Sequence, residues 1–431
     1  MMTIGIDIGT TTISAVVVDD KTKMVLQSVT TPNDNTLTAQ QEHRHLQNPH
    51  GILECVRTVI GSFANSYDIT RIGVTGQMHG ILYVDKSGYA VSPLYTWQNN
   101  FGNCLFRDCL TYCEYMEQET GYHVASGFGC VTHFYLQSTN QIPNDAVYLC
   151  TIGDYVAMQL SNVSKPIMHI SNAASLGLYD LELNQFDKKA MDLLGIDETY
   201  FPKIEKGYGN LGKTETDITV SIAIGDNQAS FFGAVDDFEQ DVLLNIGTGG
   251  QISCYSKRFV LGNLFETRPF MENTYLLVAS SLCGGRAYAA LEQFFCSTLA
   301  MAGVERSSVY EDMGKLMEKV SIDNPLTVQT LFCGTREQPD KRGEIGKIDL
   351  TNFTPQQMIH GFMAGIAQEL YLPYEEFCKQ KKFTAIMASG NMVRKNKYFQ
   401  QVLSAVYSLP LKITGFPEEA AYGAALYAIS I

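Results

Sequence analysis

Asp7-Ile8-Gly9-Thr10-Thr11-Thr12, close to the start of the chain, is the stretch of sequence that decides the fold. It joins two apolar runs rich in β-branched residues, Thr3–Ile8 and Ile13–Val18, so the pattern predicts a β-hairpin with a Gly-Thr turn. Glycine lets the backbone approach an anion, and the threonine hydroxyls add donors, so such a turn can bind phosphate. One copy alone is more typical of an ordinary hairpin turn.

A second copy of this pattern opens the other half of the chain. Gly247-Thr248-Gly249-Gly250 joins the apolar runs Val242–Ile246 and Gln251–Tyr255. Matched hairpins at the heads of two similar halves indicate an internal duplication. Two Gly-Thr turns facing each other suit a polyphosphate, so the pair favours nucleotide binding over two unrelated turns. The expected phosphate contacts from the turns are Thr10, Thr11, Thr12, Gly247, Thr248 and Gly249.

The length of 431 residues predicts two domains rather than one. Short β-rich runs alternate with amphipathic helical stretches throughout, which is typical of an α/β fold. The acidic segment Asp236–Gln240 precedes the second hairpin and predicts a boundary there. We therefore expect an N-terminal domain over residues 1–233 and a C-terminal domain over residues 240–431.

Charge and composition restrict the partners. A net charge of −14 argues against nucleic acid and membrane surfaces as the main partners. The net charge does not exclude ATP as a ligand, because backbone amides and Mg²⁺ can supply a local positive field. The start of the chain reaches an acid, Asp7, before an apolar segment long enough for a secretion signal can form, and the eleven cysteines are scattered. These features predict a cytoplasmic protein with reduced thiols, and association as a homodimer is compatible with them.

Two aspartates are candidates for the chemistry. Asp226 follows the apolar run Ile218–Ile224, which predicts a buried strand, and precedes the predicted helix Asn227–Phe232. An aspartate there is either the N-cap of that helix or the base that accepts a proton during phosphoryl transfer. Asp7 ends the first strand, where it could hold Mg²⁺ directly or through water.

Two further segments are candidates for a sugar site. Gly76-Gln77-Met78-His79-Gly80 interrupts a predicted strand, and a histidine there can present ring nitrogens to hydroxyl groups or can be a satisfied loop residue. Trp97 lies among amides in Tyr95-Thr96-Trp97-Gln98-Asn99-Asn100. An aromatic face beside amides is typical of sugar sites, although a single tryptophan is also typical of a core.

Taken in order, these segments resemble the FGGY carbohydrate kinases. The matching motifs are Asp7–Thr11, Asn245–Gly249, Gly225–Ala229 and Ser389-Gly390-Asn391. The resemblance implies the actin/hexokinase/heat-shock-ATPase superfold, in which two ribonuclease-H-like domains flank a catalytic cleft. It also implies an ATP-dependent kinase that uses Mg²⁺, with Asp226 as the catalytic base. The resemblance further implies that Gly285, Gly390 and Asn391 contact the nucleotide, in addition to the residues of the two turns.

Within this family, Gln77-Met78-His79-Gly80 is similar to the ketose-binding motif of sedoheptulokinases and xylulokinases. That similarity implies phosphorylation of a terminal primary hydroxyl of a ketose, with sedoheptulose as the first candidate and xylulose as the second. The alternatives are a kinase of the same family that acts on another sugar or a polyol, and a non-enzymatic ATP sensor on the same superfold. The implied substrate contacts are Gln77, Met78, His79, Trp97, Asn99, Asp226 and Asn227.

One segment departs from the family pattern. Where these ketose kinases carry Trp-(Asn/Gln)-Asp-x-Arg, this chain has Trp97-Gln98-Asn99-Asn100-Phe101. An acid and an arginine are therefore replaced. We expect Asn99 to take over some hydroxyl contacts of the acid, whereas Phe101 cannot take over those of the arginine.

Overall fold

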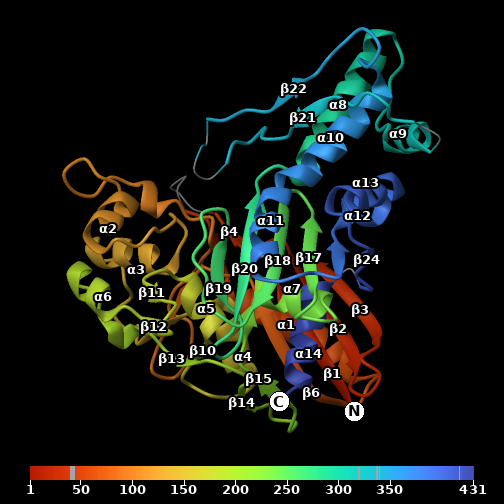
Figure 1. The fold of residues 1–431 in the computed structure, drawn as a ribbon. Coiled ribbons are helices and arrows are strands. Elements are labelled where there is room, and N and C mark those ends of the chain that lie inside the picture. The colour runs from red at the N-terminus through yellow and green to blue at the C-terminus, as the bar shows by residue number, and fades with distance from the viewer. Residues whose placement is uncertain (39–43, 319–320, 336–337, 339, 417) are drawn as a thin grey trace.

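The first of two large sheets is built from the N-terminal half. The computed structural model describes residues 1–38, 44–318, 321–335, 338, 340–416 and 418–431. Within them this sheet has the order β14-β15-β6-β1-β2-β3, with β16 also paired to β6 (Figure 1). The strands are β1 (Met2–Ile8), β2 (Thr12–Asp19), β3 (Val25–Pro32), β6 (Ile69–Gly76), β14 (Asn210–Lys213), β15 (Thr219–Ser221) and β16 (Ile224–Gly225).

The predicted first hairpin is present. β1 and β2 pair antiparallel, with Asp7 opposite Ser14. β6 runs parallel to β1, and Asp7 lies beside Thr75. β16 runs parallel to β6 and places Gly225 beside Gly76. Because these three strands are parallel, the residues that follow them all emerge at the same edge of the sheet.

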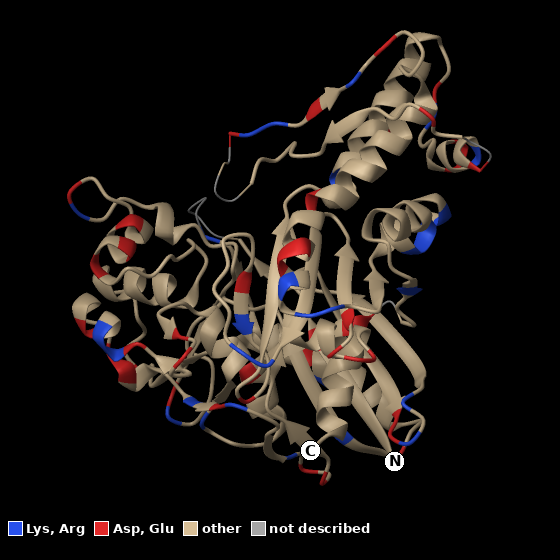
Figure 2. Cartoon of the chain, in the orientation of Figure 1, with Lys and Arg blue, Asp and Glu red and all other residues tan. Residues whose placement is uncertain are grey.

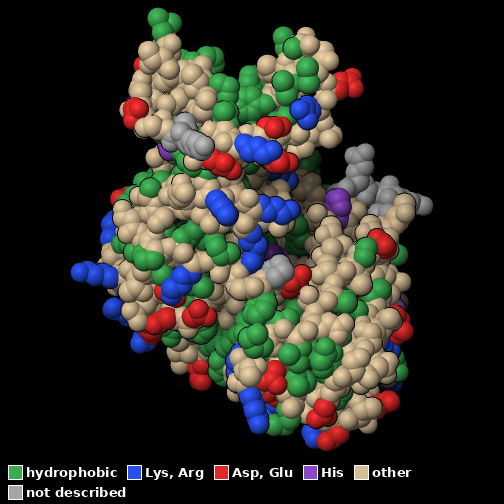
Figure 3. All heavy atoms as spheres, turned by 90° about the vertical axis from the view of Figure 1, so that its right-hand side faces the viewer, with side chains coloured by type: hydrophobic (Ala, Val, Ile, Leu, Met, Phe, Trp, Pro, Cys, Tyr) green, Lys and Arg blue, Asp and Glu red, His purple; other side chains and the backbone are tan. Residues whose placement is uncertain are grey.

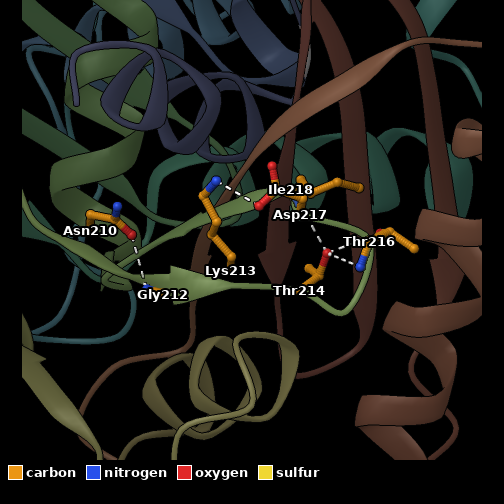
Figure 4. Close-up of polar contacts among 7 residues, drawn as sticks. All are labelled: Asn210, Gly212, Lys213, Thr214, Thr216, Asp217 and Ile218. Carbon is orange, nitrogen blue, oxygen red and sulfur yellow. Dashed lines mark hydrogen bonds and ion pairs between the residues drawn. The ribbon is translucent and has the colours of Figure 1, made fainter.

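A tight hairpin leads into this arrangement. Figure 4 shows the turn between β14 and β15, where the Thr214 hydroxyl accepts hydrogen bonds from the backbone N–H groups of Thr216 and Ile218, at 3.2 and 3.1 Å. Lys213 Nζ closes the turn with an ion pair to Asp217 at 2.6 Å. The run predicted as one strand over Ile218–Ile224 is instead two short strands, β15 and β16, because only its two ends pair with β6.

The second sheet is built from the C-terminal half in the order β19-β20-β18-β17-β23-β24. β17 and β18 form the predicted second hairpin, with Asn245 opposite Gln251. β23 runs parallel to β17 and places Ser389 beside Asn245, so the second turn and the Ser389–Asn391 turn are neighbours. The strands are β17 (Asp241–Ile246), β18 (Gly250–Ser256), β19 (Glu266–Pro269), β20 (Tyr275–Ser281), β23 (Ala385–Ser389) and β24 (Leu411–Ile413).

Each sheet is covered on one face by helices of its own half. Ile52 of α1 and Tyr155 of α4 pack with β1 and β6, while Ile359 of α10 and Leu403 of α13 pack with β17. The helices other than α7 and α14 are α1 (Pro49–Ala64), α2 (Tyr112–Thr120), α3 (Gly129–Ser138), α4 (Ile152–Leu160), α5 (Ile170–Ser175), α6 (Lys188–Leu194), α8 (Gly284–Met301), α9 (Tyr310–Met317), α10 (Pro355–Glu369), α11 (Tyr371–Gln380), α12 (Asn391–Lys395) and α13 (Lys397–Tyr407).

The other face of each sheet is covered by a helix from the opposite half. α14 (Glu419–Ile429) returns from the end of the chain to lie on β1, β2 and β6 (Figure 1). Phe231 of α7 (Asp226–Ala234) packs with Leu243 and Leu276 of the second sheet. α7 and α14 also pack against each other. The cores of the two halves are therefore interlocked, and the boundary at residues 233–240 stays a prediction.

The remaining elements form peripheral lobes. One lobe around α2, α3 and α6 has its own apolar cluster, and a second, carrying α8, α10, β21 and β22, projects from the second sheet (Figure 1). The short elements are β4 (Thr36–Leu37), β5 (Leu46–Gln47), β7 (Leu82–Val84), β8 (Leu94–Tyr95), β9 (Tyr148–Cys150), β10 (Ile167–His169), β11 (Tyr179–Asp180), β12 (Gln185–Phe186), β13 (Lys203–Glu205), β21 (Thr327–Gln329), β22 (Glu344–Gly346) and the 3₁₀ turns Phe101–Asn103 and Glu198–Tyr200.

Charged side chains are dispersed over the surface. Both basic and acidic residues are scattered over the ribbon in Figure 2, and the face drawn in Figure 3 carries both signs. In the part of the chain that the structure describes, no helix combines the length and apolarity needed to cross a membrane. All eleven cysteines are free thiols, five of them buried.

Candidate active site

The ends of three parallel strands lie together beside a cavity, which the residues at two of these ends, Asp7 and Asp226, line. Asp7 near the end of β1, the segment Gln77–His79 after β6 and Asp226 after β16 emerge at the same edge of the first sheet. A cavity of about 300 Å³ opens there between the two halves. It is lined by Asp7, Asp226, Asn227, Ser230, Leu243, Asn245, Gln251, Ser253, Arg268 and Ala420. Residues of β1, β17, β18 and β19 therefore share one site with the N-terminal ends of α7 and α14.

Asp226 is the first residue of α7 and not its N-cap. Gly225 occupies the cap position, without a side-chain hydrogen bond. The alternative that Asp226 serves as an N-cap is therefore wrong, and its carboxylate is left to face the cavity. Burial raises the pKa of Asp226 to about 6, although the Asn227 backbone N–H and the Arg268 guanidinium oppose the shift. Asp226 is thus a basic carboxylate that can accept a proton near neutral pH.

Asp7 lies close enough to Asp226 for the two carboxylates to repel each other. Burial, with a smaller contribution from the Asp226 charge, raises the pKa of Asp7 to about 7. Oxygen ligands such as the carboxylates and the Asn245 and Gln251 amides that line this cavity are those that a hard cation prefers. The donor set fits Mg²⁺, which would relieve the repulsion.

We predict that Asp7→Asn stabilises the metal-free protein. The folded pKa of Asp7 exceeds the ordinary value of about 3.9, so the folded state binds more protons than the unfolded chain between about pH 4 and 7. The free energy of unfolding is therefore highest at low pH, where Asp7 is neutral, and it falls as the pH rises through that window and the buried carboxyl becomes charged. Removing the charge should raise the free energy of unfolding by about 2 kcal/mol at pH 8, and by less at pH 5.

Urea unfolding in a chelator at both pH values measures this effect. Asp236→Asn is the matched control, because Asp236 is exposed and the substitution removes the same charge. Equal stabilisation by both variants, or a gain that does not grow with pH, would contradict the account.

The first Gly-Thr turn is tied to the candidate sugar segments. Gln47 Nε2 donates to the Thr10 carbonyl at 2.7 Å, and Trp97 Nε1 donates to Thr10 Oγ1 at 3.0 Å. Thr10 Oγ1 in turn lies 3.4 Å from Gln77 Oε1. Thr11 and Thr12 are exposed. Trp97 is itself 47% exposed, so it is not a core residue but a face beside the turn.

The second turn gathers the other predicted nucleotide residues. The Gly285 N–H donates to the Gly247 carbonyl at 2.9 Å, and a Cβ at Gly285 would lie 2.5 Å from that carbonyl oxygen. Gly390 has a φ of 92°, and a Cβ there would lie 2.2 Å from the Ile246 carbonyl oxygen. Both positions therefore require glycine. Asn391, at the start of α12, is exposed beside them.

His79 is held in a strained, defined orientation. Its φ of 70° lies in the left-handed region, which is costly for a residue other than glycine. The ring stacks on Phe128 at 4.7 Å, and Nδ1 lies 2.6 Å from the Ser175 carbonyl oxygen. Because that carbonyl can only accept a hydrogen bond, Nδ1 is the ring nitrogen that donates to it. Met78 is buried against Gly225, next to Asp226.

Asn99 does not occupy the substrate-contact position that we predicted. It is buried, and its Nδ2 donates to the carbonyls of His45 and Thr96, both at 2.9 Å, while Oδ1 accepts from the His45 N–H. Both amide donors are used by the backbone, so Asn99 supports the loop beside Trp97. Phe101 is also buried, stacked on Tyr135 at 4.3 Å.

Several lining residues were missed by sequence reasoning. Asn245 could have been found, because it matches Asp7 in the duplicated hairpin. Gln251 and Ser253 alternate along β18 and so share one face, but the sequence does not say that this face meets a cavity. Arg268 carries no local signal. Among the predicted residues, Asn227 has a buried Oδ1 without a hydrogen-bond partner in the described residues, which suits a ligand hydroxyl.

Two sheets headed by matched Gly-Thr hairpins, with carboxylates between them, define a nucleotide-dependent phosphotransferase of the actin/hexokinase type. Comparison with protein-family models agrees. Residues 2–235 match the N-terminal domain, and residues 256–430 the C-terminal domain, of the FGGY family of carbohydrate kinases. The chain belongs to this family and is an ATP-dependent carbohydrate kinase.

Similar proteins support the assignment. The mouse (Mus musculus) sedoheptulokinase is 26% identical, over 99% of this chain and 96% of the relative. A xylulose kinase structure from Lactobacillus acidophilus superposes with a TM-score of 0.81 at 19% identity, over 99% of this chain and 88% of that one. A Plasmodium falciparum glycerol kinase with ADP superposes with a TM-score of 0.80 at 18% identity, over the same shares. The two structures establish the fold.

Proposed function

We propose that the protein transfers the γ-phosphoryl group of ATP to a terminal primary hydroxyl of a ketose, with Asp226 as the base. The observation that carries this proposal is the position of Asp226 in a cavity that both phosphate hairpins line, through Asp7 of the first and Asn245 and Gln251 of the second. A carboxylate with a raised pKa can take the hydroxyl proton late in a loose transition state. Closure of the two halves around this cavity would exclude water and align the hydroxyl with the phosphoryl group.

The nucleotide would lie across the two turns. In this proposal Thr10, Thr11 and Thr12 contact phosphates from the N-terminal half. The matching contacts from the C-terminal half are Gly247, Thr248, Gly249, Gly285, Gly390 and Asn391. Mg²⁺ would be held by Asp7, directly or through water, and when bound it would offset negative charge on the phosphates. The paired hydrogen bonds of Thr10 to Gln77 and Trp97 would make the phosphate turn sensitive to the occupancy of the sugar site.

For the sugar we propose sedoheptulose, with xylulose as the second candidate. The support is the similarity to the mouse and human sedoheptulokinases, which extends over most of the chain. His79 Nε2 and Asn227 Oδ1 would accept hydrogen bonds from sugar hydroxyls, and Trp97 would cover the C–H face. Gln77 is buried and bonded to Thr10 and Gln47, so its contribution would be to position this loop.

An ADP-release screen over ketoheptoses, ketopentoses, ketohexoses and polyols tests the proposal. We expect the highest kcat/KM for sedoheptulose. Each hydroxyl contact missing from xylulose should cost about 1–3 kcal/mol, which is roughly 5- to 150-fold in kcat/KM. A higher kcat/KM for glycerol or another polyol would refute the ketose assignment. Nucleotide binding without any sugar-stimulated ADP release would instead favour the sensor alternative.

A further inference from the structure

Arg268 projects from the second sheet into the catalytic cavity. Among the described residues that line this cavity it is the one lysine or arginine. Arg268 lies opposite Leu276 in the β19–β20 pair, and paired residues of antiparallel strands share a face. Leu276 packs with Phe231 of α7, so this face is turned toward α7. The guanidinium and the Asp226 carboxylate therefore approach the same cavity from opposite halves of the molecule.

A buried hydrogen bond fixes Arg268 relative to Asp226. Gln228 follows Asp226 by two residues in α7 and is fully buried. Its Nε2 donates to the carbonyl of Pro269 at 2.8 Å. Because Pro269 follows Arg268 directly, this bond ties the strand that carries the guanidinium to the first turn of the helix that carries the carboxylate.

The guanidinium is oriented by a neighbour in its own strand. Nε and Nη2 of Arg268 donate to Glu266 Oε2 at 3.2 and 2.8 Å. These bonds use two of the five N–H donors of the guanidinium. The Arg268 side chain is 21% exposed, so it is accessible from the cavity without extending into bulk water. The remaining donors suit a planar contact with two oxygens of one anion.

The two phosphate hairpins provide no cation of their own. No lysine or arginine occurs in residues 2–19, which span β1 and β2. None occurs in residues 241–256, which span β17 and β18. The cavity already holds two carboxylates, Asp7 and Asp226. A phosphoryl group that enters the cavity adds further negative charge, and like charges within one small cavity repel strongly when the site is partly dry. The fixed cation of the protein at this point is Arg268.

We propose that Arg268 is a catalytic residue that contacts the phosphoryl oxygens during transfer. The bond from phosphorus to the bridging oxygen of ADP breaks and ADP leaves with the electron pair. The bond from phosphorus to the sugar oxygen forms, and the hydroxyl proton passes to Asp226. The guanidinium offsets the charge on the phosphoryl oxygens throughout. This assignment rests on the proposed function and adds a group from the second sheet to it.

Kinetics of Arg268→Gln, Arg268→Lys and Arg268→Ala test the proposal, with Lys257→Gln as the matched control. Lys257 follows β18 with its side chain 70% exposed and does not line the cavity, so this variant loses a cation elsewhere and should keep the wild-type kcat. We expect Arg268→Gln to lower kcat by about 100-fold or more, with KM for the sugar changed by less than about 3-fold. Arg268→Lys should recover part of the loss, and guanidinium ion added to Arg268→Ala should restore activity. If Arg268→Gln keeps a kcat within about 3-fold of wild type, or shows only a raised KM for the sugar, the proposal is overturned.

A second measurement does not depend on the identity of the sugar. ADP with Mg²⁺ and aluminium fluoride mimics the phosphoryl group in transfer, and the thermal midpoint reports its binding. We expect wild type and Lys257→Gln to gain stability over ADP alone, and Arg268→Gln to gain none. If wild type phosphorylates no ketose but still shows this difference, the proposed sugar fails while the assignment of Arg268 holds. An equal gain in all variants refutes the assignment.

Discussion

Asp226→Asn should lower the turnover number at least about 100-fold, because general-base catalysis typically contributes 100- to 10,000-fold. Asparagine has nearly the same shape but cannot accept the hydroxyl proton at neutral pH. The hydrogen bond from Gln228 to Pro269, which ties α7 to the second sheet, does not involve the Asp226 side chain, so the cavity should keep its form. ATP affinity should change by less than about 3-fold, because the phosphate turns are untouched.

The measurement is steady-state ADP release with saturating ketose, together with a nucleotide titration of the same variant. Asp217→Asn is the control for loss of a carboxylate, since Asp217 lies in the β14–β15 turn with its side chain 81% exposed. Asp217→Asn should retain full turnover. More than a tenth of wild-type turnover in Asp226→Asn would show that another group takes the proton.

Gly423→Ala should destabilise the fold by about 3 kcal/mol or more, which is large for one methyl group. A Cβ at Gly423 would lie 1.8 Å from the carbonyl oxygen of Ala229 and 2.8 Å from the backbone N of Gly233. Both atoms belong to the backbone of α7 and cannot rotate away. The intrinsic gain from alanine in a helix, about 1 kcal/mol, is too small to compensate. The substitution must therefore push α14 away from α7.

Equilibrium unfolding in urea measures the loss, and Gly61→Ala is the matched control. Gly61 also lies within a helix, α1, but no atom would come within 4 Å of a new Cβ. That variant should be unchanged or more stable by about 0.5–1 kcal/mol. Turnover of Gly423→Ala should fall as well, because α7 carries Asp226 and α14 carries Ala420 into the same cavity. Equal stability of the two variants would mean that α7 and α14 separate at little cost.

Much of the fold could be predicted because its signals are local. The apolar runs around the two Gly-Thr turns became β1, β2, β17 and β18 with the expected antiparallel pairing. Helix boundaries that depend on capping are harder to predict. The sequence pattern predicts a helix over Cys104–Glu119, but the helix begins only at Tyr112, because Thr111 and Glu114 form a capping box. Before it the chain turns back through Asp108 and Cys109, both with positive φ.

The residues of the candidate site also divide into those that the sequence could predict and those that it could not. Asp7 and Asp226 could be proposed because residues that follow parallel strands meet at one edge of the sheet. Asn99 and Arg268 could not be assigned correctly, for opposite reasons. Asn99 carries the right chemistry, but a loop around His45 and Thr96 uses its amide. Arg268 lies in a short strand without any motif, and its importance depends on which face of the second sheet meets α7.

The sequence by itself determined the duplicated hairpins, the alternation of strands and helices, and the aspartates at strand ends. Each of these follows from the order of neighbouring residues. Only the tertiary structure decided that α7 and α14 cover the sheets of the opposite halves, and that Arg268 shares a cavity with Asp226. The contact between Gly423 and Ala229 joins residues nearly 200 positions apart in the chain. Such contacts depend on the packing of complete surfaces, which no local pattern of residues encodes.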